Sequence, residues 1–292
     1  MRYEGNVFRP PSEARSYILQ CTIGCTHNRC TFCSMYKDKK YRVRPLEEIK
    51  SDIRTAKLYF GNLNKVFLAD GDALAMETAV LLEILDDLYK AFPGLNHVGI
   101  YASPDSILKK EDSELASLKE AGLTIAYLGV ETGDPELLLE IRKGVTYDEM
   151  VEAGKKIRAN GILLSATVLL GLAGRTPKAA DHARNTARIC NDINPDYIGA
   201  LTLMVEPGTE IYRRVQKGTF ELPGPFEILD ELRIIVQGLN VKETEFRSNH
   251  ASNYLSVKGR LPYDKNNMLK LINEIIEKND YKYLRPEYLR GL

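Results

Sequence analysis

Short runs of hydrophobic residues alternate along most of the chain with longer segments in which hydrophobic residues recur every three or four positions. The short runs predict β-strands and the longer segments predict amphipathic α-helices. The predicted strands cover Tyr17–Ile23, Lys65–Ala69, His97–Tyr101, Thr124–Val130, Ile162–Leu170 and Tyr197–Val205. The predicted helices between them cover Leu46–Phe60, Met76–Phe92, Ser113–Glu120, Pro135–Ile141, Tyr147–Ala159 and Pro177–Cys190.

A strand, a helix and a second strand in succession typically form a right-handed crossover between parallel strands. About six such units predict a parallel sheet covered by helices, either as an open partial barrel or as a doubly wound sheet. Six units are too few to close the eight-stranded barrel. In both architectures the functional site lies at the carboxyl ends of the strands.

The last part of the chain does not continue this alternation. It contains two predicted helices, Phe226–Leu239 and Asp264–Lys278, and a polar string from Phe246 to Tyr254 between them. No Gly/Ser-rich linker precedes it. We therefore expect residues 1–215 to form the α/β domain, and residues 216–292 to be a helical and irregular extension packed on that domain.

Composition and charge narrow the class of protein. The chain has 292 residues, 44% of them hydrophobic, and its 40 basic residues balance its 40 acidic residues, so net charge does not favour nucleic acid or an anionic membrane as a partner. Residues 1–15 lack the apolar core of a signal peptide, and no run reaches the roughly 20 apolar residues of a membrane span. Five cysteines, four of them clustered, are typical of metal ligands in a reducing compartment, which predicts a cytoplasmic protein without disulfides.

Four of the cysteines lie where the first predicted strand ends. Cys21 belongs to that strand, and the loop after it carries Cys25, Cys30 and Cys33 with the spacing Cys-x4-Cys-x2-Cys. Clustered thiolates bind zinc, copper(I) or iron–sulfur clusters. A structural zinc needs four ligands, and Cys21 or His27 could be the fourth, although no second Cys/His pair follows downstream. Three cysteines could instead hold three irons of a [4Fe–4S] cluster and leave the fourth iron open.

This loop resembles that of the radical S-adenosylmethionine superfamily, in which the open iron binds S-adenosylmethionine through its amino and carboxylate groups. Phe32 matches the aromatic residue before the last cysteine, whereas the x4 gap is one residue longer than usual. The resemblance covers residues 15–215 and implies an open (β/α)6 partial TIM barrel. It also implies a [4Fe–4S] cluster held by Cys25, Cys30 and Cys33, S-adenosylmethionine as cofactor, and an external electron donor such as flavodoxin or ferredoxin.

The end of the second predicted strand carries the string Asp-Gly-Asp-Ala-Leu, residues 70–74. From the residues alone, a helix N-cap is the simpler explanation of Asp72. In the superfamily, however, this place holds the glycine-rich segment that receives the amino group of S-adenosylmethionine. The resemblance therefore implies a cofactor-binding role for Gly71 and Asp72.

Later strand ends resemble the branch that includes coproporphyrinogen dehydrogenases, methylthiotransferases and Elongator-type enzymes. Glu131 follows an apolar strand, where a carboxylate is costly unless paired, and the resemblance implies that it contacts the cofactor. Lys143 matches a basic position that can meet the cofactor's carboxylate, although a cation at a helix end also explains it. Thr167 lies in the stretch that flanks adenine and is expected near the ribose.

Two polar segments have less specific explanations. Residues 37–44 are a basic stretch beside the cysteines, either a solvated loop or a clamp for an anionic substrate or partner. Residues 247–253 are either a surface turn or part of the lining of the barrel mouth. In the second case Arg247, Asn249 and His250 face the cavity, and His250 acts as a catalytic residue that orients the substrate or transfers a proton.

The resemblance to this superfamily implies a radical enzyme. The reduced cluster cleaves S-adenosylmethionine to methionine and a 5′-deoxyadenosyl radical, which abstracts hydrogen from an unidentified substrate, and an exposed cluster requires low oxygen. Two alternatives remain: a zinc-stabilised α/β binding module, and an RNA-modifying radical enzyme suggested by the branch. The balanced charge does not favour the RNA-modifying alternative.

Overall fold

In a computed structural model that describes residues 1–291, the chain divides into two compact units. The first unit contains residues 1–28, 35–128 and 152–164. The second contains residues 29–34, residues 129–151 and the chain from Ser165 onward. Three elements have residues in both units: β6 (Ile125–Glu131), α6 (Tyr147–Ala159) and β7 (Leu163–Leu170).

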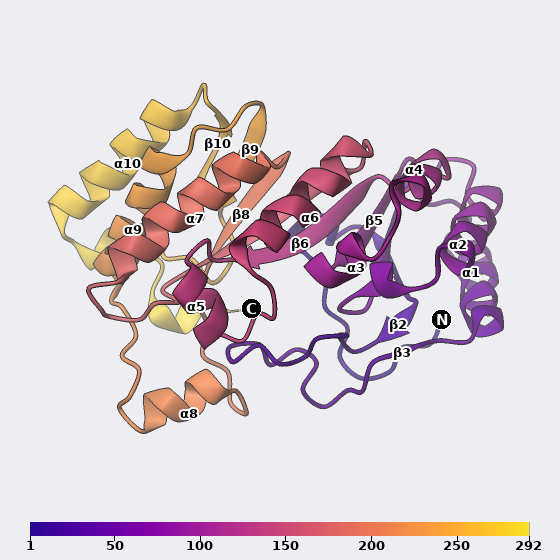
Figure 1. The fold of residues 1–292 in the computed structure, drawn as a ribbon, viewed down its shortest axis with the longest axis horizontal. Helices are drawn as coiled ribbons and strands as arrows, with labels where there is room; N and C mark the ends of the chain where they lie inside the picture. The colour runs from indigo at the N-terminus through magenta and orange to yellow at the C-terminus, as the bar shows by residue number, and fades with distance from the viewer. Residues whose placement is uncertain (292) are drawn as a thin grey trace. The chain divides into compact units, whose positions relative to one another are not determined.

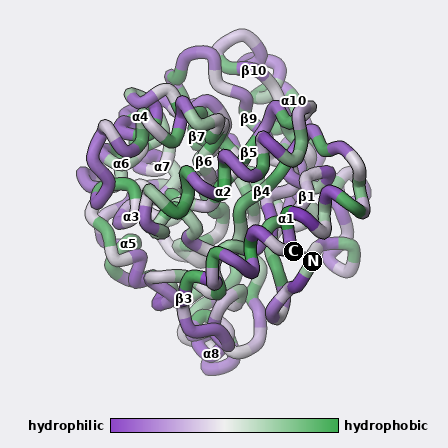
Figure 2. The backbone as a smooth tube through the Cα atoms, turned by 90° about the vertical axis from the view of Figure 1, so that its right-hand side faces the viewer, coloured by the Kyte–Doolittle hydropathy of each residue, from purple (hydrophilic) through white to green (hydrophobic). Residues whose placement is uncertain are grey.

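The first unit is built on parallel strands in the order β1-β4-β5-β6. The first three of these are β1 (Tyr17–Gln20), β4 (Lys65–Ala69) and β5 (His97–Ala102). Its helices are α1 (Leu46–Phe60), α2 (Thr78–Ala91), α3 (Pro104–Leu108) and α4 (Asp112–Glu120). Helices α1 and α2 pack side by side (Figure 1). Strand β4 is buried from Val66 to Ala69 and carries the hydrophobic colour in Figure 2, as expected of a parallel strand covered on both faces.

A buried carboxylate from the N-terminal segment packs against this sheet. Glu13 ends a 3-10 turn (Pro11–Glu13) and is only 1% exposed. It contacts His97 Nε2 at 2.7 Å, and it accepts hydrogen bonds from the hydroxyl of Tyr127 at 2.5 Å and from Ser16 Oγ. Burial alone would raise the pKa of Glu13, but the hydrogen bonds from His97, Ser16 and Tyr127 outweigh it, so the pKa is lowered. The N-terminal segment is therefore fixed to strands β5 and β6.

The second unit contains three parallel strands: β7, β8 (Tyr197–Thr202) and β9 (Thr244–Ser248). A fourth strand, β10 (Val257–Leu261), pairs antiparallel with β9. Its helices are α5 (Pro135–Glu140), α7 (Ala179–Ile193), α8 (Glu210–Gln216), α9 (Pro225–Gly238) and α10 (Lys265–Lys278). Helix α9 packs against both α7 and α10 (Figure 1).

The mostly parallel α/β architecture is confirmed, and all six predicted strands are present. Among the described strands, β1 and β10 each have a single neighbour, so the sheet is not closed. Strands β9 and β10 were not predicted: they lie in the expected extension and add a seventh parallel strand and an antiparallel one. The polar string after residue 243 conceals β9, in which buried Thr244, Phe246 and Ser248 alternate with the more exposed Glu245 and Arg247.

Candidate active site

The loop with the three clustered cysteines starts and ends at a two-stranded ribbon. Strand β2 (Thr22–Ile23) pairs antiparallel with β3 (Arg42–Val43). Gly24, just before Cys25, has φ 77°, and a Cβ there would lie 3.3 Å from both the Cβ of Lys39 and the backbone nitrogen of Tyr41. Only glycine adopts this conformation without strain in so small a space. The chain is therefore tightly constrained just before its first clustered cysteine.

Asp70, at the end of β4, is fully buried and contacts the start of this loop. Its Oδ2 accepts hydrogen bonds from the backbone N–H of Gly24 at 3.3 Å, from Gln20 Nε2 at 3.3 Å and from Lys39 Nζ at 2.8 Å. Its Oδ1 is buried and has no hydrogen-bond partner within the described part of the chain. Asp70 was not a predicted site residue, although it lies in the same Asp-Gly-Asp string as Asp72.

Asp72 is also fully buried. It accepts hydrogen bonds from Thr26 Oγ1, from Ser103 Oγ at 2.7 Å and from the backbone N–H of Ser103 at 3.0 Å. Burial raises the pKa of Asp72, and the hydrogen bonds from Thr26 and Ser103 offset this only in part. The side chain makes no cap hydrogen bond to the 3-10 turn that follows (Ala73–Ala75), so the helix-cap explanation does not hold. At Gly71 a Cβ would lie 2.5 Å from the ring of Tyr36, which explains the glycine.

The basic stretch of residues 37–44 is largely paired with acidic residues of the first unit. Besides the contact of Lys39 with Asp70, Arg44 Nη2 lies 2.9 Å from Asp52 Oδ2, and its side chain is 1% exposed. Arg42 is exposed and pairs with Glu4. These three cations stabilise the loop, and their pairing does not favour the hypothesis of an open anion clamp.

The second unit holds the part of the loop with Cys30 and Cys33. The backbone N–H of Thr31 donates to the carbonyl of Ile141 at 3.0 Å, and the carbonyl of Thr31 accepts from the N–H of Ile211 at 3.0 Å. Phe32 packs against an apolar cluster of seven buried residues: Leu137, Ile141, Leu169, Leu172, Leu203, Ile211 and Phe220. Phe32 is therefore an anchor for the segment between the last two clustered cysteines.

Glu131 and Lys143, both expected near the cofactor, form an ion pair in the second unit. Lys143 Nζ lies 3.0 Å from Glu131 Oε1, and each side chain is 12% exposed. Glu131 ends β6 with φ 64°, a left-handed conformation that is uncommon for glutamate. A Cβ at Gly129 would collide with Glu131 Oε1, so this glycine makes room for the carboxylate. The pair compensates the cost of burying a carboxylate at a strand end.

A second buried polar network lies directly after Glu131. Thr132 Oγ1 is 2.8 Å from His182 Nδ1, and His182 Nε2 is 3.1 Å from Glu231 Oε1. Glu231, on α9, also accepts from the backbone N–H of Gly171, which follows β7, at 2.9 Å. This network joins the ends of β6 and β7 to the C-terminal segment. This network was not predicted, although the acidic Glu231 among the apolar residues of an amphipathic helix is a sequence signal for it.

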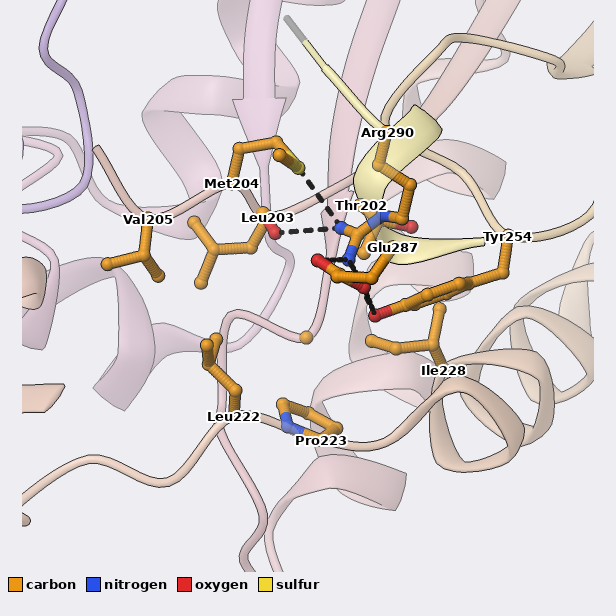
Figure 3. A pocket seen from close by; sticks show the side chains of 11 residues that line it. Thr202, Leu203, Met204, Val205, Leu222, Pro223, Ile228, Tyr254, Glu287 and Arg290 are labelled. Carbon is orange, nitrogen blue, oxygen red and sulfur yellow. Dashed lines mark hydrogen bonds and ion pairs between the residues drawn. The ribbon is translucent and has the colours of Figure 1, made fainter. Parts of the chain in front are cut away.

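A cavity of about 290 Å³ lies in the second unit after β8 (Figure 3). Its walls include the apolar side chains of Leu203, Met204, Val205, Leu222, Pro223 and Ile228. The guanidinium of Arg290 lies over the ring of Tyr254 at 4.0 Å, and Arg290 Nη1 contacts Glu287 Oε1 at 2.7 Å. The cavity is therefore apolar with one polar corner.

His250 does not line this cavity; Tyr254, from the same segment, does. His250 Nδ1 is 2.9 Å from Ser252 Oγ, and burial, followed by the charge of Arg285, lowers the pKa of the imidazole. Its proposed catalytic role stays a prediction. Thr167 is partly exposed on β7 opposite Gly199 of β8, and its place near the ribose also stays a prediction.

Burial divides the five cysteines into two groups. Cys25, Cys30 and Cys33 are half-buried thiols, whereas Cys21 and Cys190 are fully buried. Burial raises the pKa of Cys21 and of Cys190 to about 12, which disfavours the thiolate that metals bind. Over residues 1–291, no three His, Cys, Asp or Glu side chains already converge as ligands of a metal ion. The fit of the loop to a cluster therefore rests on its donor chemistry: three accessible thiols, the soft ligands that iron–sulfur clusters use.

No helix in the described part of the chain is long and apolar enough to span a membrane.

Comparison with known proteins adds a family match. The sequence model of the Radical SAM superfamily matches residues 19–186, more than half of the chain. A heme chaperone of Bacillus subtilis, HemW, is 25% identical over 203 residues, which are 68% of this chain and 51% of that protein. A probable threonylcarbamoyladenosine tRNA methylthiotransferase of Methanocaldococcus jannaschii is 28% identical over 119 residues, 40% of this chain and 27% of that protein. The chain spans about half the length of these relatives, or less.

Solved structures show the same fold. Coproporphyrinogen III oxidase (HemN) of Escherichia coli matches with a TM-score of 0.59 and 17% identity, over 77% of this chain and 53% of that one. Methylornithine synthase (PylB) matches with a TM-score of 0.55 and 19% identity, over 78% of this chain and 64% of that one. At these identities the likeness concerns the arrangement of strands and helices.

Proposed function

Because this chain belongs to the radical SAM superfamily, a superfamily of enzymes, we propose that it cleaves S-adenosylmethionine reductively by means of a [4Fe–4S] cluster. The bound cluster and S-adenosylmethionine supply a 5′-deoxyadenosyl radical, with methionine as the other product, and the radical abstracts hydrogen from the substrate. The observation that carries the proposal is the contrast between three half-buried thiols in one loop and two fully buried cysteines elsewhere. Only the first group has the access that a metal ligand needs.

Cys25, Cys30 and Cys33 each hold one iron in this proposal. Three ligands leave the fourth iron of the cluster open for S-adenosylmethionine. Cys21 is excluded from the ligand set by its burial and by its contact with the carbonyl of Leu19, at 3.5 Å. His27 takes no part in the proposed ligand set, since three cysteines suffice.

In this proposal S-adenosylmethionine is bound by residues at the ends of β4 and β6 and by Thr167 within β7. Glu131 uses Oε1 for Lys143, which holds the carboxylate in place, and offers its other oxygen to the cofactor. At the end of β4, Asp70 Oδ1 is a buried acceptor without a partner in residues 1–291, and the amino group of S-adenosylmethionine would satisfy it. Gly71 lies between Asp70 and Asp72 and is proposed to contact the cofactor through its backbone, and Thr167 on β7 is the polar group proposed for the ribose.

The apolar cavity of Figure 3 supports an organic substrate with a hydrophobic part. The relatives are named for unlike tasks, heme handling and tRNA modification, so their names do not define this substrate. Flavodoxin or ferredoxin would supply the electron, and the cytoplasm is the compartment proposed for an oxygen-sensitive cluster.

The test is anaerobic reconstitution with iron and sulfide. We expect iron in the protein, a broad absorbance near the edge of the visible range, and 5′-deoxyadenosine when S-adenosylmethionine and a strong reductant are added. Zinc in the purified protein, with no iron uptake, would instead establish the zinc-stabilised binding module. Iron uptake without 5′-deoxyadenosine would contradict the proposed cleavage.

A further inference from the structure

The two residues that flank Cys25 are both held by carboxylates at the end of β4. On one side the backbone N–H of Gly24 donates to Asp70 Oδ2 at 3.3 Å. On the other side the hydroxyl of Thr26 donates to Asp72 Oδ2. Cys25 thus stands between two attachment points, and all five residues belong to the first unit.

The two carboxylates are themselves immobilised. Asp72 accepts from both the backbone N–H and the hydroxyl of Ser103, whose side chain also forms a capping box with Ser106 at the start of α3. Asp70 is held by Lys39 Nζ at 2.8 Å and by Gln20 Nε2 at 3.3 Å. Both aspartates are fully buried, where a polar group that loses its hydrogen-bond partner is costly.

The chain is also joined to the end of β4 just before Gly24. Thr22 Oγ1 accepts a hydrogen bond from the backbone N–H of Asp70 at 3.0 Å. Contacts from Thr22, Gly24 and Thr26 therefore attach the chain to the end of β4 on both sides of Cys25.

We propose that Asp70 and Asp72 are positioning residues for Cys25: they fix the backbone on both sides of this cysteine and so direct its thiol toward the metal. The inference rests on the proposed function in one respect, that Cys25 is an iron ligand. It differs from what the resemblance implies for Asp72, because the carboxylate oxygens of this residue are engaged by Thr26 and Ser103 rather than presented to the cofactor.

Thr26 gives the sharpest test, since it lies on the surface and its replacement does not create a buried cavity. Thr26→Val removes the hydroxyl and keeps the shape, and Thr26→Ser keeps the hydroxyl. Thr55→Val is the matched control: Thr55 is exposed on α1, and its hydroxyl donates to the carbonyl of Ser51 at 2.9 Å. Asp72→Asn is a second variant that changes the other partner of the same contact.

Two measurements are made on each variant. Hydrogen exchange of residues 22–28 in the metal-free protein reports the attachment itself, and iron per chain after reconstitution reports its consequence. We expect exchange about tenfold faster in Thr26→Val, as for the loss of one hydrogen bond to a charged group, together with reduced iron. Thr26→Ser and Thr55→Val should behave as the natural protein does, and Asp72→Asn should resemble Thr26→Val.

The outcomes separate the two proposals. Unchanged exchange and unchanged iron in Thr26→Val would overturn the positioning role of Asp72 and leave the enzyme proposal intact. Faster exchange in that variant with full iron loading would also overturn it, because the attachment would then have no bearing on the ligand. If even the natural protein takes up no iron, the enzyme proposal fails, and with it the inference, whatever the exchange of the variants.

Discussion

Cys21 lies only four residues before Cys25, yet the two thiols have different surroundings. Cys21 lies between β1 and β2 and is completely buried, which raises its pKa to about 12, whereas Cys25 is half-buried after Gly24. Burial penalises the charged thiolate, so accessibility decides which cysteine can bind a metal.

The first prediction concerns the ligand set. Alanine at Cys25, Cys30 or Cys33 should each abolish the iron–sulfur cluster, since each removes one of three protein ligands. Alanine at Cys21, and at Cys190 as a second buried control, should leave iron per chain unchanged after reconstitution. Iron lost in the Cys21 variant, with native thermal stability, would show a fourth cysteine ligand.

The ion pair of Glu131 and Lys143 leads to a prediction on cofactor binding. Glu131→Gln should keep the cluster but weaken S-adenosylmethionine binding by ~1–3 kcal/mol, since one charge-assisted hydrogen bond is lost. Calorimetric titration of the reconstituted protein measures this. Glu136→Gln is the control, because Glu136 forms an exposed ion pair with Lys178 on the same unit. Equal affinities in the two variants would assign Glu131 a purely structural role.

His250 leads to a prediction about turnover. His250→Ala should leave formation of 5′-deoxyadenosine without substrate unchanged, because that step needs only the cluster and the cofactor. Turnover of the true substrate should fall if the imidazole orients it or transfers a proton. A variant that loses both activities, or neither, would remove His250 from the substrate side of the site.

The site residues proposed from the sequence have a local signal, whereas the contacts that were not predicted join residues far apart in the chain. The cysteine spacing and the strand-end glutamate are visible within a few residues. The contact between Thr26 and Asp72 joins positions 46 residues apart, and that between His182 and Glu231 joins two different helices. Such pairs depend on how strands and helices pack, which one sequence does not specify residue by residue.

At the scale of elements, the attachment of the N-terminal segment through Glu13 predicts a pH dependence. The pKa of Glu13 in the folded protein is lowered from its ordinary value of 4.5, so its stabilising contribution is complete above that value. It is lost as the pH falls through the lowered pKa of the folded state. Glu13→Gln should therefore reduce the free energy of unfolding by about 2 kcal/mol at pH 7, and by less in acid.

Urea unfolding of the natural protein and of Glu13→Gln, at neutral pH and near pH 3, measures the difference in the free energy of unfolding. Glu47→Gln, at an exposed position of α1, is the control and should match the natural protein at both pH values. If the free energies of unfolding of Glu13→Gln and the natural protein differ by the same amount at both pH values, the carboxylate contributes by its shape rather than by its charge.

The pattern of hydrophobic residues predicts some strands of this sheet and not others. Strands such as β4 are continuous apolar runs because parallel strands are buried on both faces, and these were predicted. Strand β9 alternates Thr244, Phe246 and Ser248 inward with charged residues outward, and only one of the inward residues is strongly hydrophobic. Its polar composition resembles that of a loop, so burial by its neighbours, and not its own pattern, makes it a strand.

At the scale of the whole molecule, an unclosed sheet must protect its edges. Strand β10 ends the sheet in the second unit, and its Lys258 and Arg260 are exposed. Charged residues on an edge strand oppose pairing with another copy of the chain. Lys258→Val should therefore promote self-association that increases with concentration, measurable by sedimentation velocity.

Lys270→Val is the matched control, since Lys270 is exposed on α10, where a helix offers no free strand edge. We expect this variant to remain in the same state as the natural protein at all concentrations. Equal association of the two variants would attribute the effect to added surface hydrophobicity rather than to the strand edge.

The β9–β10 hairpin also affects the chain while the ribosome is still making it. Strand β10 follows all seven parallel strands in the sequence, so the edge of β9 stays bare until Leu261 has emerged. At roughly 5–20 residues per second, synthesis of the stretch from Ser248 to Leu261 takes about a second, whereas a hairpin closes in about 1–10 μs. The rate of translation, and not the rate of folding, therefore determines how long the edge of β9 in a nascent chain is exposed to other nascent chains on the same polysome.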